Sequence, residues 1–212
     1  MENSNGAGKT VKYIVGIDEV GRGPIAGPVC VAAFTLPRNY ELLINNYELK
    51  LPKLKDSKKL SRKQREVWFD FLKDQKEKGN CNYAVSFVSS ENIDKFGIAK
   101  CIQKALDSSL LNLMKTSGLE PSSCKLMLDG GLHAPTEYIN QETIIRGDEL
   151  HPVISMASIM AKVSRDRIMI NYAKIYPEYG FDSHVGYGTK SHYSAIKKHG
   201  QTPIHRKTFI HI

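Results

Sequence analysis

Two acidic residues stand side by side near the start of the chain, and a glycine-framed arginine follows them at once. The segment reads Gly16-Ile17-Asp18-Glu19-Val20-Gly21-Arg22-Gly23-Pro24. Adjacent carboxylates repel each other, so a site that uses both needs a cation to offset their charge. The glycine loop, Gly21-Arg22-Gly23, lets the backbone approach a ligand closely and offers a planar positive group suited to phosphate. The alternative is a solvated acidic turn before a tight loop.

Two further acids, Asp129 and Asp148, each follow a short apolar run. A single acid after a strand is ordinarily a turn residue or a helix cap. Three strand ends of this kind indicate more, because strand tips are where an α/β sheet places its ligands. Asp18, Glu19, Asp129 and Asp148 at one sheet edge would form an all-oxygen site. Such a site selects Mg²⁺ or Mn²⁺ over zinc, which prefers histidine and cysteine.

The elements that must position these acids follow from hydrophobic periodicity. Residues 11–17 alternate with period two, which predicts a strand that ends at Asp18 and Glu19. Neighbours on a strand point to opposite faces, so the two acids share one site only if the chain bends there, as Gly21 and Gly23 allow.

Strands and helices alternate along the rest of the chain. Strands are predicted over 27–36, 81–88, 125–129 and 143–146, and helices after the capping box of Ser61 and Gln64, along 98–113, from Pro152 to Tyr176, and before Gly200. The short connection before the strand at 27–36 predicts that it pairs antiparallel with the first strand.

Basic residues gather in two places. Lysines and arginines crowd residues 50–65, and Ser158, Lys162 and Arg165 recur on one face of a predicted helix. For both groups the alternative to a binding role is a solvated surface. The histidines of the last third of the chain show no convincing metal-ligand spacing, so we expect most of them to lie at the surface or to form hydrogen bonds.

Composition narrows the class of protein. At 212 residues the chain predicts one domain, and 30 Lys and Arg against 22 Asp and Glu give a net charge of +8, which suits a polyanionic partner. The four cysteines are scattered without a CxxC pair, as in reduced intracellular proteins. No apolar run reaches membrane-spanning length and the start is not signal-like, so we expect a cytoplasmic protein that binds no membrane.

The motifs together resemble those of the type 2 ribonucleases H, specifically the ribonuclease HII family. The matching segments, in the family's order and over nearly the whole chain, are Gly16-Ile17-Asp18-Glu19-Val20-Gly21-Arg22-Gly23-Pro24, Asp56-Ser57-Lys58-Lys59-Leu60, Leu128-Asp129-Gly130, Gly147-Asp148, Ala157-Ser158-Ile159-Met160-Ala161-Lys162-Val163-Ser164-Arg165-Asp166 and His205-Arg206-Lys207-Thr208-Phe209. The resemblance implies an α/β ribonuclease H-like fold, a central mixed β-sheet flanked by helices on both faces with a C-terminal helical extension. We expect a disordered tail over 1–10, a catalytic domain over 11–178 and the extension over 179–212.

The resemblance also implies an activity. A member of this family would be an endoribonuclease that hydrolyses the RNA strand of RNA/DNA hybrids and cuts on the 5′ side of single ribonucleotides in duplex DNA. Asp18 would bridge two Mg²⁺ or Mn²⁺ ions, and Glu19, Asp129 and Asp148 would complete their coordination. One ion would activate the attacking water and the other would stabilise the leaving 3′-oxygen, which gives 5′-phosphate and 3′-hydroxyl ends. We expect the enzyme to be a monomer.

Substrate contacts are likewise implied by the resemblance. Backbone groups of Gly21, Arg22 and Gly23 would address the 2′-hydroxyl that separates RNA from DNA. Tyr187 would stack against the sugar after the scissile phosphate. Further substrate or active-site contacts are expected from Lys58, Ser158, Lys162 and Arg165. Gly188 and Val185 depart from the family's usual proline and basic residue, which predicts a more flexible loop around Tyr187.

Two alternatives remain. Ribonuclease HIII usually carries an extra N-terminal domain, lacks the glycine–arginine–glycine loop and has glutamate as its fourth acid. Here Asp18 lies near the start of the chain, the loop is present and the fourth acid is Asp148. A non-catalytic module that binds hybrids through its basic surface is the other alternative, and four acids facing phosphates would weaken such binding unless metals intervene.

Overall fold

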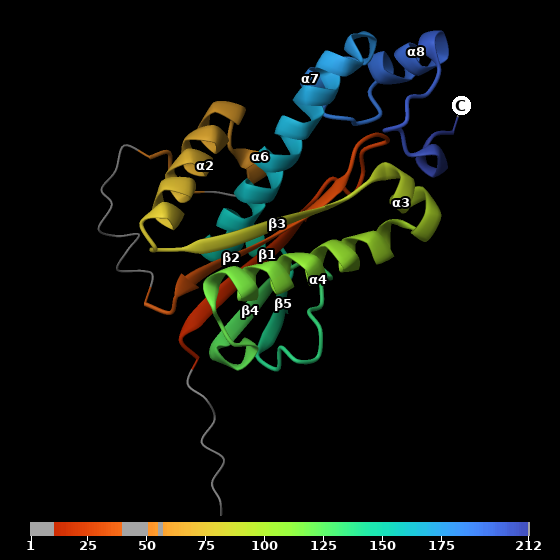
Figure 1. The fold of residues 1–212 in the computed structure, drawn as a ribbon. Coiled ribbons are helices and arrows are strands. Elements are labelled where there is room, and N and C mark those ends of the chain that lie inside the picture. Colours follow the sequence, from red (N-terminus) through yellow and green to blue (C-terminus); the bar gives the residue numbers. More distant parts are fainter. Residues whose placement is uncertain (1–10, 40–50, 55–56, 212) are drawn as a thin grey trace, which may run out of the picture.

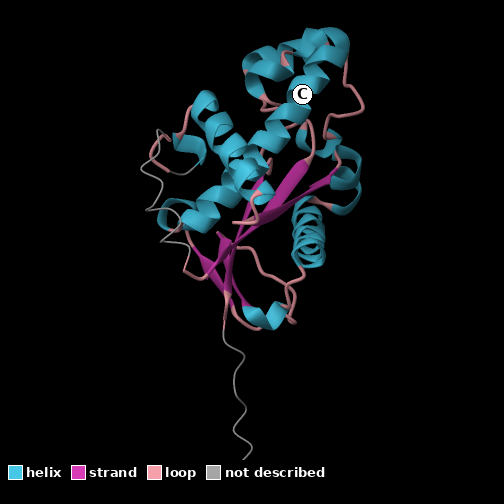
Figure 2. Cartoon of the chain, turned by 60° about the vertical axis from the view of Figure 1, so that its left-hand side comes forward, coloured by secondary structure: helices cyan, strands magenta, loops and turns pink. Residues whose placement is uncertain are grey.

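The computed structural model describes residues 11–39, 51–54 and 57–211 (Figure 1). The tail expected over residues 1–10 and Asp56 of the basic motif lie outside the described residues. The described residues build one mixed β-sheet with helices on both of its faces (Figure 2). This arrangement confirms the predicted α/β class.

Within the described residues, five strands form the sheet in the order β3-β2-β1-β4-β5. They are β1 (Tyr13–Val20), β2 (Val29–Pro37), β3 (Asn82–Val88), β4 (Cys124–Asp129) and β5 (Gln141–Ile144). β1 is central, pairing antiparallel with β2, as predicted, and parallel with β4. Because β4 and β5 run parallel to β1, all three strands end at the same edge of the sheet.

Helices and helical turns connect these strands. They are η1 (Ser57–Lys59), α2 (Arg62–Glu77), α3 (Ser90–Phe96), α4 (Ile98–Ser117), η2 (Pro121–Ser123), α5 (Gly147–Leu150), α6 (Pro152–Ile175), η3 (Pro177–Tyr179), α7 (Phe181–His184), α8 (Lys190–His199) and η4 (Lys207–Phe209). The predicted capping box is confirmed, since Ser61 and Gln64 exchange side-chain hydrogen bonds with each other's backbone amides at 3.2 and 2.9 Å. The predicted helix start at Pro152 and the C-cap at Gly200 are confirmed as well.

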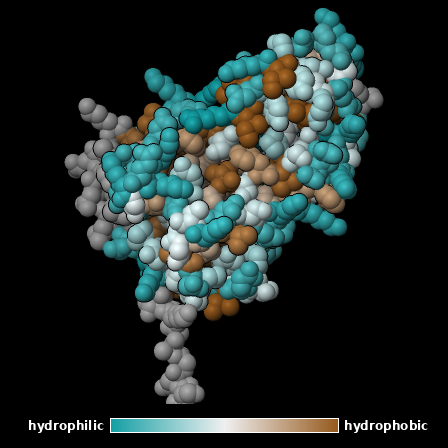
Figure 3. Space-filling view, viewed as in Figure 1, coloured by the Kyte–Doolittle hydropathy of each residue, from teal (hydrophilic) through white to brown (hydrophobic). Residues whose placement is uncertain are grey.

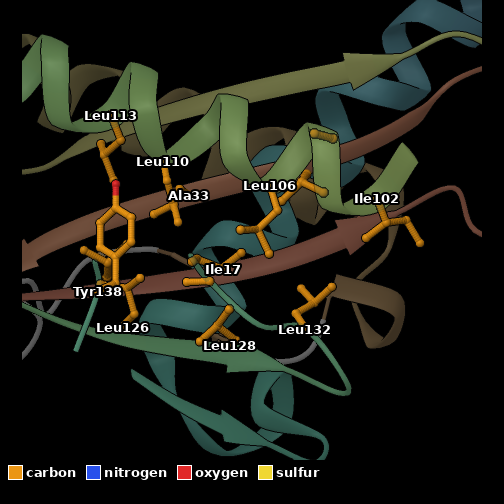
Figure 4. Packing of buried hydrophobic residues seen from close by; sticks show 14 of the residues in the cluster. Ile17, Ala33, Ile102, Leu106, Leu110, Leu113, Leu126, Leu128, Leu132 and Tyr138 are labelled. Carbon is orange, nitrogen blue, oxygen red and sulfur yellow. The ribbon is translucent and has the colours of Figure 1, made fainter. Parts of the chain in front are cut away.

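Side chains alternate along β1 and so enter two separate cores. Val15 and Ile17 face a cluster built on α4, which packs over β2 and β3 and shares its apolar core with residues of β1 and β4 (Figure 4). Ile14 and Gly16 face the opposite layer, which is formed by α6 and α2. The apolar face predicted for the helix along 98–113 is therefore core, as expected.

β1 runs further than the sequence pattern predicted. Its ladder with β2 continues through Asp18 and Glu19 to Val20, so both acids lie inside the strand. The strand was predicted to end at these two acids, and it ends one residue later because the pairing with β2 continues to Val20. The turn expected at the glycine loop does follow, and Gly21 has a φ of +92°.

The end of the chain folds back against the segment that follows β1. A third apolar cluster joins Ile25, Ala26 and Met169 to residues of the C-terminal part, namely Tyr179, Phe181, Ala195, Ile196, Ile204 and Ile210. The segment expected as an extension over 179–212 therefore packs on residues that precede it. Its boundary as a separate unit stays a prediction.

The surface is mainly polar on the face shown in Figure 3, with smaller hydrophobic areas between hydrophilic side chains. Among the described residues, no helix combines the length and the hydropathy needed to cross a bilayer.

Candidate active site

The centre of the candidate site lies where β1 passes beneath α6. Gly16 makes this crossing possible, because a Cβ at that position would overlap the carbonyl group of Val153. Asp18 lies two residues further on the same face of β1 and is only 3 % exposed. Ser158 of α6, itself fully buried, lies close enough to Asp18 for its hydroxyl to lower the pKa of that carboxyl. The crossing therefore places Asp18 next to the Ser158 hydroxyl.

Asp18 shares its surroundings with the three other predicted acids. Burial raises the pKa of Asp18 well above its usual value, and the nearby hydroxyl of Ser158 lowers it. The remaining causes all raise this pKa, and they are the charges of three further carboxylates, Glu19, Asp129 and Asp148. The structure thus brings together the four acids singled out in the sequence, which we call the acid cluster.

Glu19 lies at the rim of the acid cluster. Its backbone N–H donates to Asp18 Oδ1 at 2.8 Å, and its carboxylate lies 3.8 Å from Arg22. Burial raises the pKa of Glu19 most, the charge of Asp129 raises it further, and Arg22 and Lys58 lower it. The side chain therefore connects the acids to basic residues on either side.

Asp129 and Asp148 reach the cluster by different routes. Asp129 ends β4, next to β1, and its Oδ1 accepts a 2.7 Å hydrogen bond from the backbone N–H of Gly147. Asp148 was predicted at a strand end, and that was wrong: β5 stops at Ile144, and Asp148 lies in the short helix α5. Arg146, with a left-handed φ of 59°, turns the chain into α5.

Two of the predicted basic contacts lie in different settings. Lys58 is exposed, and its Nζ is 3.5 Å from Asp148 Oδ2. The turn that carries Lys58 is held in place because Ser57 Oγ lies 2.7 Å from Ser158 Oγ. Lys162 is half-buried and pairs with Asp166 at 2.8 Å. Burial lowers the pKa of Lys162 most, although Asp166 opposes that shift.

The donor set of the acid cluster fits a divalent cation. No three His, Cys, Asp or Glu side chains among the described residues form a ready-made metal-binding group. Chemically the set is nonetheless suitable, because four carboxylates supply only hard oxygen ligands. Their mutual repulsion, seen in the raised pKa of Asp18, is relieved by any cation that binds between them.

The glycine loop lies beside Tyr187. A Cβ on Gly23 would come within 3.9 Å of the Tyr187 ring, so this ring lies over the loop. Arg22 and Tyr187 are both exposed, with 46 % of Tyr187 accessible. The loop that Gly188 and Val185 were expected to loosen is tied to the segment after β1, since Gly186 O accepts from Ile25 N at 2.9 Å and from Ala26 N at 3.2 Å. Its flexibility stays a prediction.

Two arginines form a part of the site that the sequence reasoning missed. Arg165 was expected to be a substrate or active-site contact on a polar helix face, but it is fully buried. Arg206 is fully buried as well and donates to backbone carbonyls of the glycine loop. The helical spacing marked Arg165, but it does not reveal that Ala26, Pro28 and Val185 cover that face. For Arg206 the only signal was its position in the last of the matching motifs.

Comparison with known proteins agrees with this architecture. A family model described as Ribonuclease HII matches residues 15–212. A Ribonuclease HII from Endomicrobium trichonymphae is 43% identical over 196 residues, which are 92% of this chain and 84% of the relative. Among solved structures, the PCNA:RNase HII complex from Archaeoglobus fulgidus contains a chain with a TM-score of 0.70 at 23% identity, covering 94% of this chain and 96% of that one.

A second solved structure, Bst-RNase HIII in complex with Mn²⁺, has a TM-score of 0.69 at 16% identity and covers 95% of this chain and 68% of its own. At these identities the two structural likenesses concern the fold alone. They confirm the predicted ribonuclease H-like fold.

Proposed function

The chain belongs to the ribonuclease HII family and is therefore an endoribonuclease of the ribonuclease H type, and we propose that it also cuts duplex DNA on the 5′ side of a single embedded ribonucleotide. The products would carry 5′-phosphate and 3′-hydroxyl ends. One observation carries this proposal: a cluster of four carboxylates lies directly beside a glycine loop and an exposed tyrosine. The cluster would perform the hydrolysis, and the loop would choose the nucleotide.

The acid cluster would hold two Mg²⁺ or Mn²⁺ ions through Asp18, Glu19, Asp129 and Asp148. Asp18 would be the central ligand of this set, because the charges of all three other acids act on its carboxyl. When bound, the ions supply the Lewis acidity that activates a water molecule and offsets the charge on the leaving 3′-oxygen. Carboxylate ligands suit these hard cations better than they suit zinc.

The protein's own groups would hold the acids in place for this chemistry. The Ser158 hydroxyl next to Asp18 favours the ionised form of the carboxyl, although burial works against ionisation. The amide of Gly147 fixes one oxygen of Asp129. Lys58, exposed and close to Asp148, is placed to contact a substrate phosphate. Ser158 is fully buried, so we assign it to orienting Asp18 and not to direct substrate contact.

Lys162 is the weakest of the proposed contacts. Its Nζ pairs with Asp166, which also lies 4.0 Å from Arg65, so the lysine belongs to a small ion-pair network on α6 and α2. A phosphate contact from Lys162 would have to compete with Asp166 for the ammonium group.

Selectivity for a ribonucleotide would come from the glycine loop and Tyr187. A 2′-hydroxyl both donates and accepts hydrogen bonds, so backbone amides and carbonyls at close range can identify it. Exposed Gly23 carries no side chain that would keep the sugar away, whereas a Cβ on buried Gly21 would displace Arg165 beneath the loop. The Tyr187 ring over Gly23 would then pack against the following deoxyribose, where an additional 2′-hydroxyl would crowd it.

The deciding experiment is cleavage of a labelled DNA duplex that contains one ribonucleotide, with Mg²⁺, with Mn²⁺ and with a chelator. We expect a single cut on the 5′ side of the ribonucleotide, only with added metal. An all-DNA duplex is the substrate control, and Asp129→Asn is the protein control, which we expect to bind without cutting. Cleavage in the presence of the chelator would refute the metal assignment, and an intact single-ribonucleotide duplex would refute the proposed specificity.

A further inference from the structure

Two buried guanidinium groups lie beneath the glycine loop and the Tyr187 segment. Arg206 donates from Nε to Gly27 O at 2.9 Å, from Nη1 to Arg22 O at 3.1 Å and from Nη2 to Gly21 O at 2.7 Å. Because the guanidinium is a planar fork with fixed donor directions, these three carbonyls are held in one arrangement. A lysine, with one flexible ammonium, cannot reproduce it.

The inward carbonyls determine where the amides of the loop point. In a planar trans peptide the C=O and the following N–H point in opposite directions. With the carbonyls of Gly21 and Arg22 turned towards Arg206, the N–H groups of Arg22 and Gly23 point away from it. Arg22 and Gly23 are exposed, so these two amides face the side from which a substrate approaches.

Arg165 joins the segment that follows the glycine loop to the Tyr187 segment. It donates to Pro28 O at 2.9 Å and Ala26 O at 3.1 Å on one side, and to Val185 O at 2.9 Å on the other. The two segments thereby share one buried donor, in addition to the backbone bonds that end on Gly186. The spacing between the outward amides and the Tyr187 ring is set by these contacts.

A pair of buried histidines holds the backbone of Tyr187 from the other side. His205 Nδ1 accepts from the backbone N–H of Thr202 at 2.8 Å, so its Nε2 carries the proton. That proton is donated to His192 Nε2 at 3.0 Å, and His192 Nδ1–H donates to Tyr187 O at 2.8 Å. Both rings are neutral in this arrangement, and burial lowers the pKa of each, that of His192 to about 4.

We infer that Arg206 and Arg165 are positioning residues for ribonucleotide selectivity, which hold the outward amides of Arg22 and Gly23 at a fixed distance from the Tyr187 ring. This inference rests on the proposed function of the loop. His192 and His205 fix the Tyr187 carbonyl, and we call these two histidines together with Arg165 and Arg206 the frame. The acid cluster is not part of the frame, so the frame governs which nucleotide is cut more than whether a bond is cut.

The electrostatics favour a functional role over a merely structural one. Burying two like charges side by side costs stability. This cost is reflected in the pKa of Arg206, which is lowered to about 9, mainly by burial and to a smaller extent by the charge of Arg165. Neutral donors would hold the same carbonyls at a smaller cost. Two positive groups behind outward amides also favour an anionic ligand in front of them.

The test compares Arg206→Lys with the wild type on two substrates, the single-ribonucleotide duplex and a continuous RNA/DNA hybrid. We expect the ratio of kcat/KM for the first substrate to that for the second to fall about tenfold, as the loss of one charge-assisted hydrogen bond predicts. Leu110→Ala, in the core on the other side of the sheet, is the matched control for lost stability. It should lower the melting temperature and leave the ratio unchanged.

Two outcomes of the Arg206→Lys comparison would overturn the inference. One is a folded Arg206→Lys protein with the wild-type ratio, and the other is an equal change of the ratio in Leu110→Ala. If Arg206→Lys does not fold, His192→Phe provides the test, because it keeps the ring and removes the bond to Tyr187 O. A wild-type ratio in that variant would also overturn the inference. Wild-type protein that leaves the single-ribonucleotide duplex intact would instead refute the proposed function.

Discussion

The carboxylates of the acid cluster repel one another, whereas the polar groups of the neighbouring glycine loop are held by matched partners. Burial and three neighbouring charges raise the pKa of Asp18. By contrast, Arg165 and Arg206 place six hydrogen bonds on six carbonyls, and no buried side-chain nitrogen or oxygen among the described residues lacks a partner. The half of the site around the glycine loop, which we propose recognises the nucleotide, is therefore preorganised, whereas the acid cluster, which we propose cuts the strand, keeps a charge repulsion that bound cations would relieve.

The largest effect should come from neutralising the acid cluster. Asp18→Asn removes the central carboxylate of the proposed metal site, so we expect the rate of cleavage to fall by roughly a thousandfold or more. Binding of an RNA/DNA hybrid should persist or improve, because negative charge near the phosphates is lost. Single-turnover rates and binding titrations separate the two effects. Near-normal turnover in Asp18→Asn, Asp129→Asn or Asp148→Asn would remove that residue from the metal assignment.

The preorganised arrangement around the glycine loop can be disrupted by a substitution at Gly21. A Cβ there would overlap the Arg165 side chain, and the φ of +92° adds backbone strain. Gly21→Ala should therefore slow cleavage of both substrates, by about a hundredfold. Gly79→Ala is a matched control, since Gly79 also has a positive φ of +75° but open space around its Cα. Equal losses in both variants would show that backbone strain alone, without displacement of Arg165, is responsible.

The contributions of the two halves of the site to folding stability should change with pH in opposite directions. Asp18 and Glu19 have raised pKa values, so the metal-free fold loses stability as the pH rises above their unfolded values near 4. His192 has a pKa lowered to about 4, so its contribution to stability grows as the pH rises from about 4 to 6.5. That contribution is on the order of 3 kcal/mol for a shift of this size.

Urea unfolding of metal-free protein between pH 4 and 8 measures both contributions. We expect Asp18→Asn to make stability rise more steeply with pH, and His192→Phe to make the rise shallower. The opposite change in either variant would contradict the assigned pKa directions.

Tyr187 should affect selectivity more than rate. Tyr187→Ala removes the ring over Gly23, and we expect activity on the single-ribonucleotide duplex to fall several-fold more than activity on a continuous hybrid. Tyr187→Phe keeps the ring and serves as the control. Initial rates on the two substrates test this prediction. If Tyr187→Ala leaves the ratio of the two rates unchanged, another residue recognises the junction between the ribonucleotide and the following deoxyribonucleotide.

The smallest effect should come from the exposed lysine beside the acids. Lys58→Ala should weaken binding and lower the slope of log K against log salt by about one unit, as expected for one lost phosphate contact. Lys125, which pairs with Glu142 on β4 and β5, is a comparable lysine away from the cluster, and Lys125→Ala should leave the slope unchanged. The same slope for wild type and Lys58→Ala would show that Lys58 is a solvated surface residue that contacts no phosphate.

Sequence reasoning identified the acids because their chemistry is local. Carboxylates after apolar runs, a capping box and a helix that starts at proline are all readable within a few residues, and the structure contains each feature. The helical setting of Asp148 was not predicted, and β1 ends one residue beyond its predicted end. Both depend on pairing with a neighbouring strand or on a left-handed residue such as Arg146, which short-range patterns do not reveal.

Arg165, Arg206 and the histidine pair could not be assigned from the sequence for a different reason. The partners of the two arginines are backbone carbonyls 20 to 185 positions away along the chain. The histidines bond to each other across thirteen positions, and His192 also bonds to the Tyr187 carbonyl. A carbonyl has no signature in a sequence, so an arginine that binds carbonyls looks the same as one that faces solvent. Burial, which depends on the whole fold, makes the distinction.

The close crossing at Gly16 fixes where the first turn of α6 meets the sheet. At 24 residues and 1.5 Å per residue the helix is about 36 Å long, and it carries Ser158 in its second turn and Arg165 two turns further on. One continuous helix therefore sets the position of the serine beside Asp18 and of the arginine that donates to Val185. The absence of a side chain at one strand position thus determines how two distant parts of the candidate site are spaced.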